Sequence, residues 1–253
     1  MSDHVTVTRE EGVLLLTLNR PEKKNALTGA MYGTLIEAFD EADRDERIGA
    51  VVIAGAGGVF SAGNDIGDFL QFAASPGAAP PFRFVRRLAS LETPLVAAVD
   101  GLAVGIGTTL LLHCDLAYAA PTARFRMPFV DLGLVPEAGS SLLLPQRVGT
   151  AKAAELLLLA EAFDAAEALR LGLLNGVVPA DELLPHAHAQ ARKLAAKPRG
   201  AVAATRRLLR GDRTALLAQM DAEGQAFGAA LASPEAKAAF MAFLSKPKAA
   251  AAS

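Results

Sequence analysis

Apolar residues along the chain follow two patterns, short uninterrupted runs and longer stretches with helical spacing. These runs predict strands at 5–8, 13–18, 50–54, 95–99 and 116–120, of which those at 50–54 and 95–99 are expected to be buried. The first two runs flank a Glu-Glu-Gly turn at 10–12 and therefore predict a hairpin. Apolar residues at every third or fourth position from Met31 to Ala42 predict an amphipathic helix over 28–44.

The rest of the chain alternates between helical patterns and short apolar segments. Helices are expected at 82–92, 105–113, 136–145, 149–160 and 164–172, and weaker strands at 123–128 and 175–179. A Pro- and Gly-containing stretch predicts a loop at 68–80, and past residue 181 the pattern is almost entirely helical. We see no linker that would divide the chain into independent domains. Short buried strands between helices are typical of the α/β class, here with a helical C-terminal region.

Composition and charge argue against several classes of function. The 253 residues carry a net charge of −2, which argues against non-specific binding to nucleic acid or to a membrane surface. Cys114 is the single cysteine, so an internal disulfide and a cysteine-rich zinc site are both excluded. No apolar run approaches the ~18 residues of a membrane span, and no secretory signal is visible. We therefore expect a cytoplasmic protein.

Two glycine-rich segments follow buried strands. "SAGND" at 61–65 comes after the strand at 50–54, and "GIG" at 105–107 comes after the strand at 95–99. Glycine permits close backbone approach, and the first amides of a helix have no intrahelical acceptor. Two such amides aimed at one point would form an oxyanion hole. Ordinary strand-to-helix turns would look the same, and the pattern leaves both interpretations open.

Glu137 is the one charged residue in "LGLVPEAGSSLLLP", at 132–145. If a helix begins at Pro136, the carboxylate would complement the helix dipole. If the side chain instead faces an apolar cavity, desolvation would raise its pKa toward the range of a general base. The sequence alone leaves these two roles open.

Other chemistry finds little support in the sequence. The glycines do not match a dinucleotide-binding or Walker A motif, and a G-x-S-x-G elbow is absent. None of the four histidines has spacing that suggests a metal site or a nucleophile's base. We expect no metal and no separate cofactor.

Six segments in order, "NRPEKKNAL", "FSAGND", "AAVDGLAVGIG", "CDLAYA", "LGLVPEAGSS" and "AEALRLGLLNGVV", resemble the crotonase (enoyl-CoA hydratase/isomerase) superfamily. The resemblance implies a spiral core of ββα repeats over 1–195 and a helical trimerisation region over 196–253. It implies an acyl-CoA thioester as substrate, with CoA as part of that substrate, and a homotrimer or hexamer. These properties are expectations that come from the resemblance and not from the spacing of residues.

The resemblance also assigns site residues. The backbone N–H groups of Asn64 and Ile106 would form the oxyanion hole for the thioester oxygen. Substrate-binding positions would be Ser61, Ala62, Gly63, Asn64, Asp65, Gly105 and Lys24. The lysine is a plausible partner for a CoA phosphate, although it could equally be solvated.

Departures from the family pattern bear on the reaction. Hydratases of the family carry two catalytic glutamates. At the positions that match them by resemblance, this chain has Thr109 and Phe129. Glu137 remains, in a context similar to Δ3,Δ2-enoyl-CoA isomerases of the peroxisomal type, which act in fatty acid β-oxidation. One acid suffices to move a proton between two carbons, so we expect an isomerase with Glu137 as acid/base. The alternatives are a hydratase or other crotonase-type reaction, and a catalytically silent acyl-CoA-binding protein.

Overall fold

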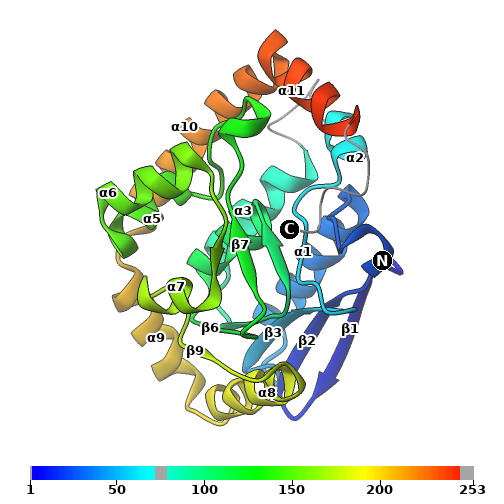
Figure 1. Cartoon of the computed structure of the whole chain (residues 1–253). Helices are drawn as coiled ribbons and strands as arrows, with labels where there is room; N and C mark the ends of the chain where they lie inside the picture. The colour runs from blue at the N-terminus through cyan, green and yellow to red at the C-terminus, as the bar shows by residue number, and fades with distance from the viewer. Residues whose placement is uncertain (1, 72–78, 246–253) are drawn as a thin grey trace.

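The strands form two sheets in a computed structural model that describes residues 2–71 and 79–245 (Figure 1). The larger sheet has the strand order β1 (Val5–Glu10), β2 (Val13–Leu18), β3 (Ala50–Gly55), β4 (Leu95–Val99), β6 (Leu116–Ala119) and β9 (Gly176–Val177). The smaller sheet has the order β5 (Leu102–Val104), β7 (Arg124–Arg126) and β8 (Phe163–Asp164). β1 pairs antiparallel with β2 as the predicted hairpin, and the other pairs of the larger sheet are parallel.

Helices connect and cover these strands. They are α1 (Gly29–Arg44), α2 (Ile66–Gln71), α3 (Pro80–Ser90), α4 (Ile106–Thr109), α5 (Ser140–Val148), α6 (Thr150–Ala154), α7 (Ala165–Arg170), α8 (Ala180–Ala195), α9 (Arg199–Arg210), α10 (Arg213–Ala232) and α11 (Pro234–Ser245). Short 3-10 turns lie at η1 (Pro21–Lys23), η4 (Leu110–His113) and η5 (Val130–Leu132), and a π turn lies at η6 (Glu155–Leu159). The architecture is the α/β class that the sequence predicts.

Both faces of the larger sheet are buried at β3 and β4, which explains why these strands read as uninterrupted apolar runs, whereas β1 at the edge is largely exposed. Along β3, Val51 and Ile53 face the main core with α1 and α3, whereas Ala50 and Val52 face α8. The helix α8 lies beneath the sheet in Figure 1, opposite α1 and α3. Alternate side chains of one strand thus enter two separate cores.

The C-terminal helices run along one side of the molecule, from α9 near α8 at the bottom of Figure 1 to α11 at the top. On this path α10 packs against α3 and α5. The helical region beyond residue 195 therefore reaches back to segments from the middle of the chain. Within 2–71 and 79–245, no helix is long and apolar enough to cross a membrane.

Most of the predicted elements are present, with small shifts of their ends. α1 starts after Thr28, whose hydroxyl accepts a hydrogen bond from the Met31 amide. Asp164 caps α7 in the same way, and Gly172 follows that helix in the left-handed region. The helix expected at 105–113 is divided into α4 and the 3-10 turn η4.

The predicted loop at 68–80 is wrong at both ends. α2 extends through residue 71 and α3 begins at Pro80, while 72–78 lie outside the described residues. The strands β5 and β8 were not predicted, because two or three residues carry too little periodicity to be recognised.

The prediction of a helix from Pro136 to Pro145 is also wrong. Ala138 and Gly139 both adopt positive φ angles, of 60° and 69°, and a right-handed helix cannot pass through them. The helix α5 therefore begins at Ser140, after Glu137, and continues through Pro145 to Val148.

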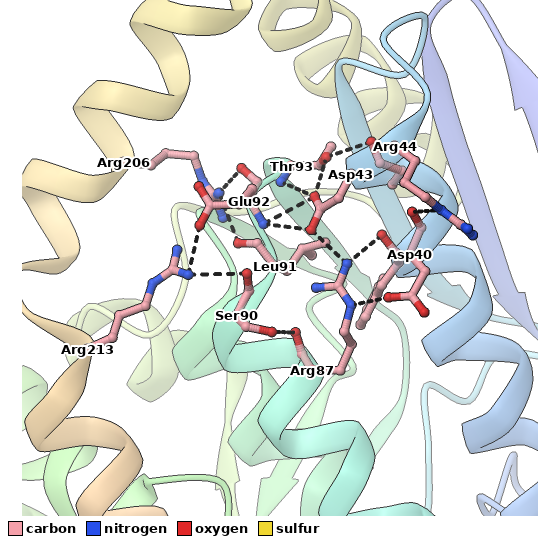
Figure 2. Close-up of polar contacts among 12 residues, drawn as sticks. Asp40, Asp43, Arg44, Arg87, Ser90, Leu91, Glu92, Thr93, Arg206 and Arg213 are labelled. Atoms are coloured by element: carbon pink, nitrogen blue, oxygen red, sulfur yellow. Dashed lines mark hydrogen bonds and ion pairs between the residues drawn. The ribbon is translucent and has the colours of Figure 1, made fainter.

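Asp43, near the end of α1, joins that helix to the segment between α3 and β4 (Figure 2). Its carboxylate accepts hydrogen bonds from the Thr93 amide and hydroxyl, both at 2.8 Å, and from Arg87 at 2.6 Å. Burial raises the pKa of Asp43, but the hydrogen bonds from Thr93, the Glu92 amide and Arg87 outweigh burial and hold it below its ordinary value.

We expect Asp43→Asn to lower the free energy of unfolding by about 1–3 kcal/mol in urea titrations at pH 7, because buried donors lose a charged acceptor. Since the folded pKa is lowered, the stabilisation by Asp43 is present above its unfolded pKa and is lost as the pH falls. Asp40→Asn is the matched control: Asp40 also pairs with Arg87, but its side chain is 46% exposed against 19% for Asp43. Its effect should stay below about 0.5 kcal/mol. Equal effects of the two substitutions would contradict this account.

Candidate active site

The two glycine-rich segments of the sequence lie side by side in the structure. Ser61 and Ala103 form a parallel bridge, in which the Ser61 amide donates to the Leu102 carbonyl and the Val104 amide donates to the Ser61 carbonyl, both at 2.9 Å. A Cβ atom on Gly63 would lie 2.8 Å from the carbonyl oxygen of Val104. Glycine is therefore required at 63 for the loops to approach this closely.

Both predicted oxyanion donors are amides that this arrangement leaves open. Asn64 bridges to Leu27, but its neighbours use that bridge: the Leu27 amide donates to the Gly63 carbonyl and the Asp65 amide to the Leu27 carbonyl. Ile106 is the first residue of α4, where an amide has no intrahelical acceptor. Within the described part of the chain neither amide has a backbone acceptor. Their joint use as an oxyanion hole stays a prediction.

Several of the predicted substrate-binding residues hold the first loop in place. The Ser61 hydroxyl donates to the Asn25 carbonyl and accepts from the Gly63 amide. Asp65 pairs with Arg20 at 2.7 Å. The Lys24 carbonyl accepts from the Ala62 amide, and the lysine residue itself is exposed. These contacts account for the loop geometry, and contact with a substrate remains a prediction for the same residues.

Glu137 is buried, with 8% of its surface exposed. It lies before α5 and not in its first turn, so the predicted dipole role of a first-turn residue is wrong. Thr109 of α4 donates a hydrogen bond from its hydroxyl to Glu137 Oε1 at 2.6 Å. Burial raises the pKa of Glu137 to about 8, against the effect of the Thr109 hydroxyl, which favours the carboxylate. A carboxyl with this pKa can both accept and return a proton near neutral pH.

A small cavity connects Glu137 with the first glycine loop. Its walls include Glu137, Asn64, Tyr32 of α1 and Phe82 of α3. The Tyr32 hydroxyl donates to Asn64 Oδ1 at 2.5 Å, so a fully buried phenol orients the loop that carries the Asn64 amide. Burial raises the pKa of Tyr32, which keeps the phenol protonated as a donor. Glu137 and Asn64 thus line the same small cavity.

A larger cavity of about 450 Å³, also lined by Glu137, lies between α3 and α10. Its lining includes Phe82 and Val85 of α3, and Met220 and Glu223 of α10. The volume and the mixed apolar lining suit a small organic group.

The positions at which the resemblance places two hydratase glutamates have other roles here. Thr109 is fully buried and bonded to Glu137. Phe129 is part of the main hydrophobic core. Neither position can supply a carboxylate to the cavity.

Sequence reasoning missed Tyr32 and Glu223. Tyr32 was counted as an ordinary position of the predicted amphipathic helix, and only the fold brings its hydroxyl to Asn64. Glu223 lies in a small-residue stretch of α10, "DAEGQAFG", where a glutamate looks solvated. The structure instead leaves it 6% exposed in the wall of the larger cavity.

In the described part of the chain no group of three or more His, Cys, Asp or Glu could hold a metal ion.

The raised pKa of Glu137 has a consequence for stability. Between the ordinary value of 4.5 and the folded value of about 8, unfolding releases a proton from this carboxyl. Stability is therefore lost as the pH rises through this window, by about 1.4 kcal/mol per pH unit.

We expect the isosteric Glu137→Gln to remove this loss. The unfolding free energy of the variant minus that of the parent should therefore increase from pH 5 to pH 8. Urea titrations at four pH values measure the difference. Glu10→Gln, at an exposed position of β1, is the control and should stay parallel to the parent. A Glu137→Gln curve parallel to the parent would contradict the burial argument.

The chain is similar to known proteins over nearly its whole length. The family model for enoyl-CoA hydratase/isomerase matches residues 8–251. The enoyl-CoA delta isomerase 2 of Rattus norvegicus is 37% identical over 255 residues, covering 98% of this chain and 65% of that protein. The 2,3-dehydroadipyl-CoA hydratase of Escherichia coli K12 is 36% identical over 243 residues, 95% of each chain. The crystal structure of an enoyl-CoA hydratase/isomerase from Pseudoalteromonas atlantica superimposes with a TM-score of 0.91 at 42% identity, covering 96% and 97% of the two chains. The chain belongs to the enoyl-CoA hydratase/isomerase family of the crotonase superfamily.

Proposed function

We propose that this crotonase-type acyl-CoA enzyme is a Δ3,Δ2-enoyl-CoA isomerase in which Glu137 is the only acid/base. The observation that carries the proposal is the buried carboxyl of Glu137, whose pKa is raised to about 8, in a cavity shared with Asn64. At the position for which the resemblance implies a hydratase glutamate, this chain has Thr109, whose hydroxyl donates to Glu137.

The reaction needs one proton to leave C2 and one to arrive at C4. The Glu137 carboxylate removes a C2 proton from the 3-enoyl thioester, and the electron pair of the C–H bond delocalises onto the thioester oxygen as a dienolate. The protonated Glu137 then delivers its proton to C4, and the remaining π electrons form the C2–C3 double bond. No atom is gained or lost, and no water, metal or redox partner takes part.

The amides of Asn64 and Ile106 would stabilise the dienolate oxygen. Each donor of this kind contributes about 3 kcal/mol to lowering the barrier. Proton transfer by a positioned carboxylate contributes on the order of 10²–10⁴-fold. A base with a raised pKa is strong enough to remove a C2 proton, because the thioester and the two amides make that proton more acidic.

Water addition is the competing reaction of the family. A hydratase needs groups that orient water and deliver a proton, and the two positions at which the family carries glutamates are Thr109 and Phe129 here. The names of the similar proteins include both an isomerase and a hydratase, so relatedness does not decide between them. A silent acyl-CoA-binding protein is disfavoured by the burial of Glu137, which costs stability without serving binding.

The proposal also covers the oligomeric state and the metabolic pathway. We propose a homotrimer or hexamer in the cytoplasm, acting in fatty acid β-oxidation on a CoA thioester without a further cofactor, with Lys24 near a CoA phosphate. Sizing chromatography of the purified chain and CoA binding by Lys24→Ala test the assembly and the contact.

The first test of the reaction compares substrates. We expect the protein to convert 3-hexenoyl-CoA to the conjugated 2-enoyl thioester, followed by absorbance, at a higher rate than it hydrates crotonyl-CoA. Glu137→Gln should lower kcat by at least about 10²-fold. A hydration rate above the isomerisation rate would favour the hydratase, and an unchanged rate in Glu137→Gln would eliminate this residue as the base.

The second test concerns Thr109. Thr109→Val removes the hydroxyl that favours the Glu137 carboxylate, so we expect the acid limb of kcat/KM to move about one pH unit upward. The rate at pH 7 should fall roughly 10-fold because less of Glu137 is ionised. Thr109→Ser keeps the hydroxyl and should retain the parent profile. Identical pH profiles for the valine and serine variants would show that the hydrogen bond does not set the protonation of Glu137.

A further inference from the structure

Glu223 is a second buried carboxyl beside the candidate site, and the proposed reaction does not use it. It projects from α10 toward the start of α5. Its Oε2 accepts from the Gly139 amide at 2.6 Å, and its Oε1 accepts from the Ser141 amide and hydroxyl at 2.9 and 2.5 Å. Glu223 thus has the contact with the first amides of α5 that the sequence suggested for Glu137.

These hydrogen bonds hold the turn that carries Glu137. Ala138, the next residue, has a left-handed φ of 60°, which costs a non-glycine residue about 1 kcal/mol and persists only where neighbours enforce it. His113 Nε2 donates to the Ala138 carbonyl at 2.7 Å, and Glu223 binds the amide that follows. Ser140 donates from its hydroxyl to the Glu137 carbonyl at 2.6 Å. The backbone of the turn is therefore held at three successive residues.

The helix α10 packs closely on this turn. A Cβ atom on Gly139 would lie 2.4 Å from Leu216 Cδ1 of α10. Glu223 and Glu137 also line the same cavity. The turn that carries Glu137 is therefore in contact with the helix that carries Glu223.

The charge of Glu223 also affects the protonation of Glu137. Burial is the largest cause of the raised pKa of Glu137, and the negative charge of Glu223 raises it further. The other groups near this pair come from each packed element: Tyr32 of α1, Arg86 of α3 in an ion pair with Asp221 of α10, Thr109 of α4, and His113 of η4. Burial lowers the pKa of His113 to about 4, so its ring is neutral at pH 7.

We propose that Glu223 is a positioning residue for Glu137: its carboxylate clamps the turn at 137–141, and its charge keeps Glu137 a strong base. The inference rests on the proposed role of Glu137 as acid/base. A merely structural Glu223 would join α10 to α5 and leave the titration of Glu137 unmoved, so the two accounts give different results.

The first experiment follows the titration of Glu137 without using activity. The difference in unfolding free energy between Glu137→Gln and the parent is measured from pH 4 to pH 9, and measured again in a Glu223→Gln background. Glu223→Gln keeps the size of the side chain and an oxygen acceptor but removes the charge. We expect the midpoint of the difference curve to move down by on the order of half to one pH unit. An unmoved midpoint would overturn the electrostatic part of the proposal.

Asp221→Asn is the matched control for charge. Asp221 lies on the same helix and lines the same cavity, but its side chain is 56% exposed and paired with Arg86. Removing its charge should leave the midpoint within about 0.2 pH units, because solvent screens it. A shift equal to that of Glu223→Gln would overturn the specific pairing of Glu223 with Glu137.

The second experiment tests the clamp by kinetics on 3-hexenoyl-CoA. We expect Glu223→Ala to lower kcat by about 10- to 100-fold with KM changed less than threefold, and Glu223→Gln to recover most of kcat while its acid limb lies at lower pH. Parent values of kcat in both variants would overturn the clamp. If instead Glu137→Gln retains full activity, the proposed function fails, whereas the stability titration still decides whether Glu223 controls the protonation of Glu137.

Discussion

Glu137 is a buried carboxyl without a cationic partner among the described residues, and the elements packed around it determine its protonation. Among the described residues no arginine, lysine or histidine pairs with Glu137, and its one hydrogen-bond donor is the Thr109 hydroxyl. An isolated buried carboxylate is costly, so the group is held largely protonated and its pKa is raised to about 8. The same property that lowers stability at neutral pH makes the group a strong base when it ionises. A site of this kind exchanges some stability for reactivity.

The protein gives its two neighbouring buried carboxyls different hydrogen-bond partners. Burial raises the pKa of Glu223 as it does that of Glu137, but Glu223 receives two amides and a hydroxyl at the start of α5, all of which favour its ionised form. Glu137, on the preceding turn, receives one hydroxyl and faces the cavity. A helix that began at Pro136 would place its free amides near Glu137. The left-handed residues Ala138 and Gly139 prevent this, so the free amides at the start of α5 lie after Glu137 and bind Glu223 instead.

The fold by itself does not choose the reaction. Proteins of this family that are similar over nearly the whole chain carry the names of an isomerase and of a hydratase. The bridge between Ser61 and Ala103 holds the 61–65 and 103–107 segments close together. In our proposal the choice between the two reactions depends on the groups beside these segments, which are Thr109, Phe129 and Glu137. Function here is decided by the site rather than by the architecture.

The sequence alone determined the elements whose signals are local. The apolar runs at 50–54 and 95–99 are β3 and β4 almost to the residue, because burial on both faces leaves no polar position. Thr28 and Asp164 mark helix starts, since a capping side chain acts within three residues. The ordered motifs were enough to indicate the family and to single out Glu137.

Only the tertiary structure decided what surrounds that residue. Pro136 and Pro145 suggested helix ends, but the left-handed turn between Glu137 and Ser140 is enforced by α10, and Glu223 is 84 residues away from Gly139. Tyr32 and Asn64 are 32 residues apart, and Thr109 and Glu137 are 28 apart. Periodicity reports on neighbours along the chain, whereas the pKa of a buried group depends on the atoms that packing brings around it. The sequence could therefore single out Glu137 as the candidate acid, but it could not show how burial shifts the pKa of that group.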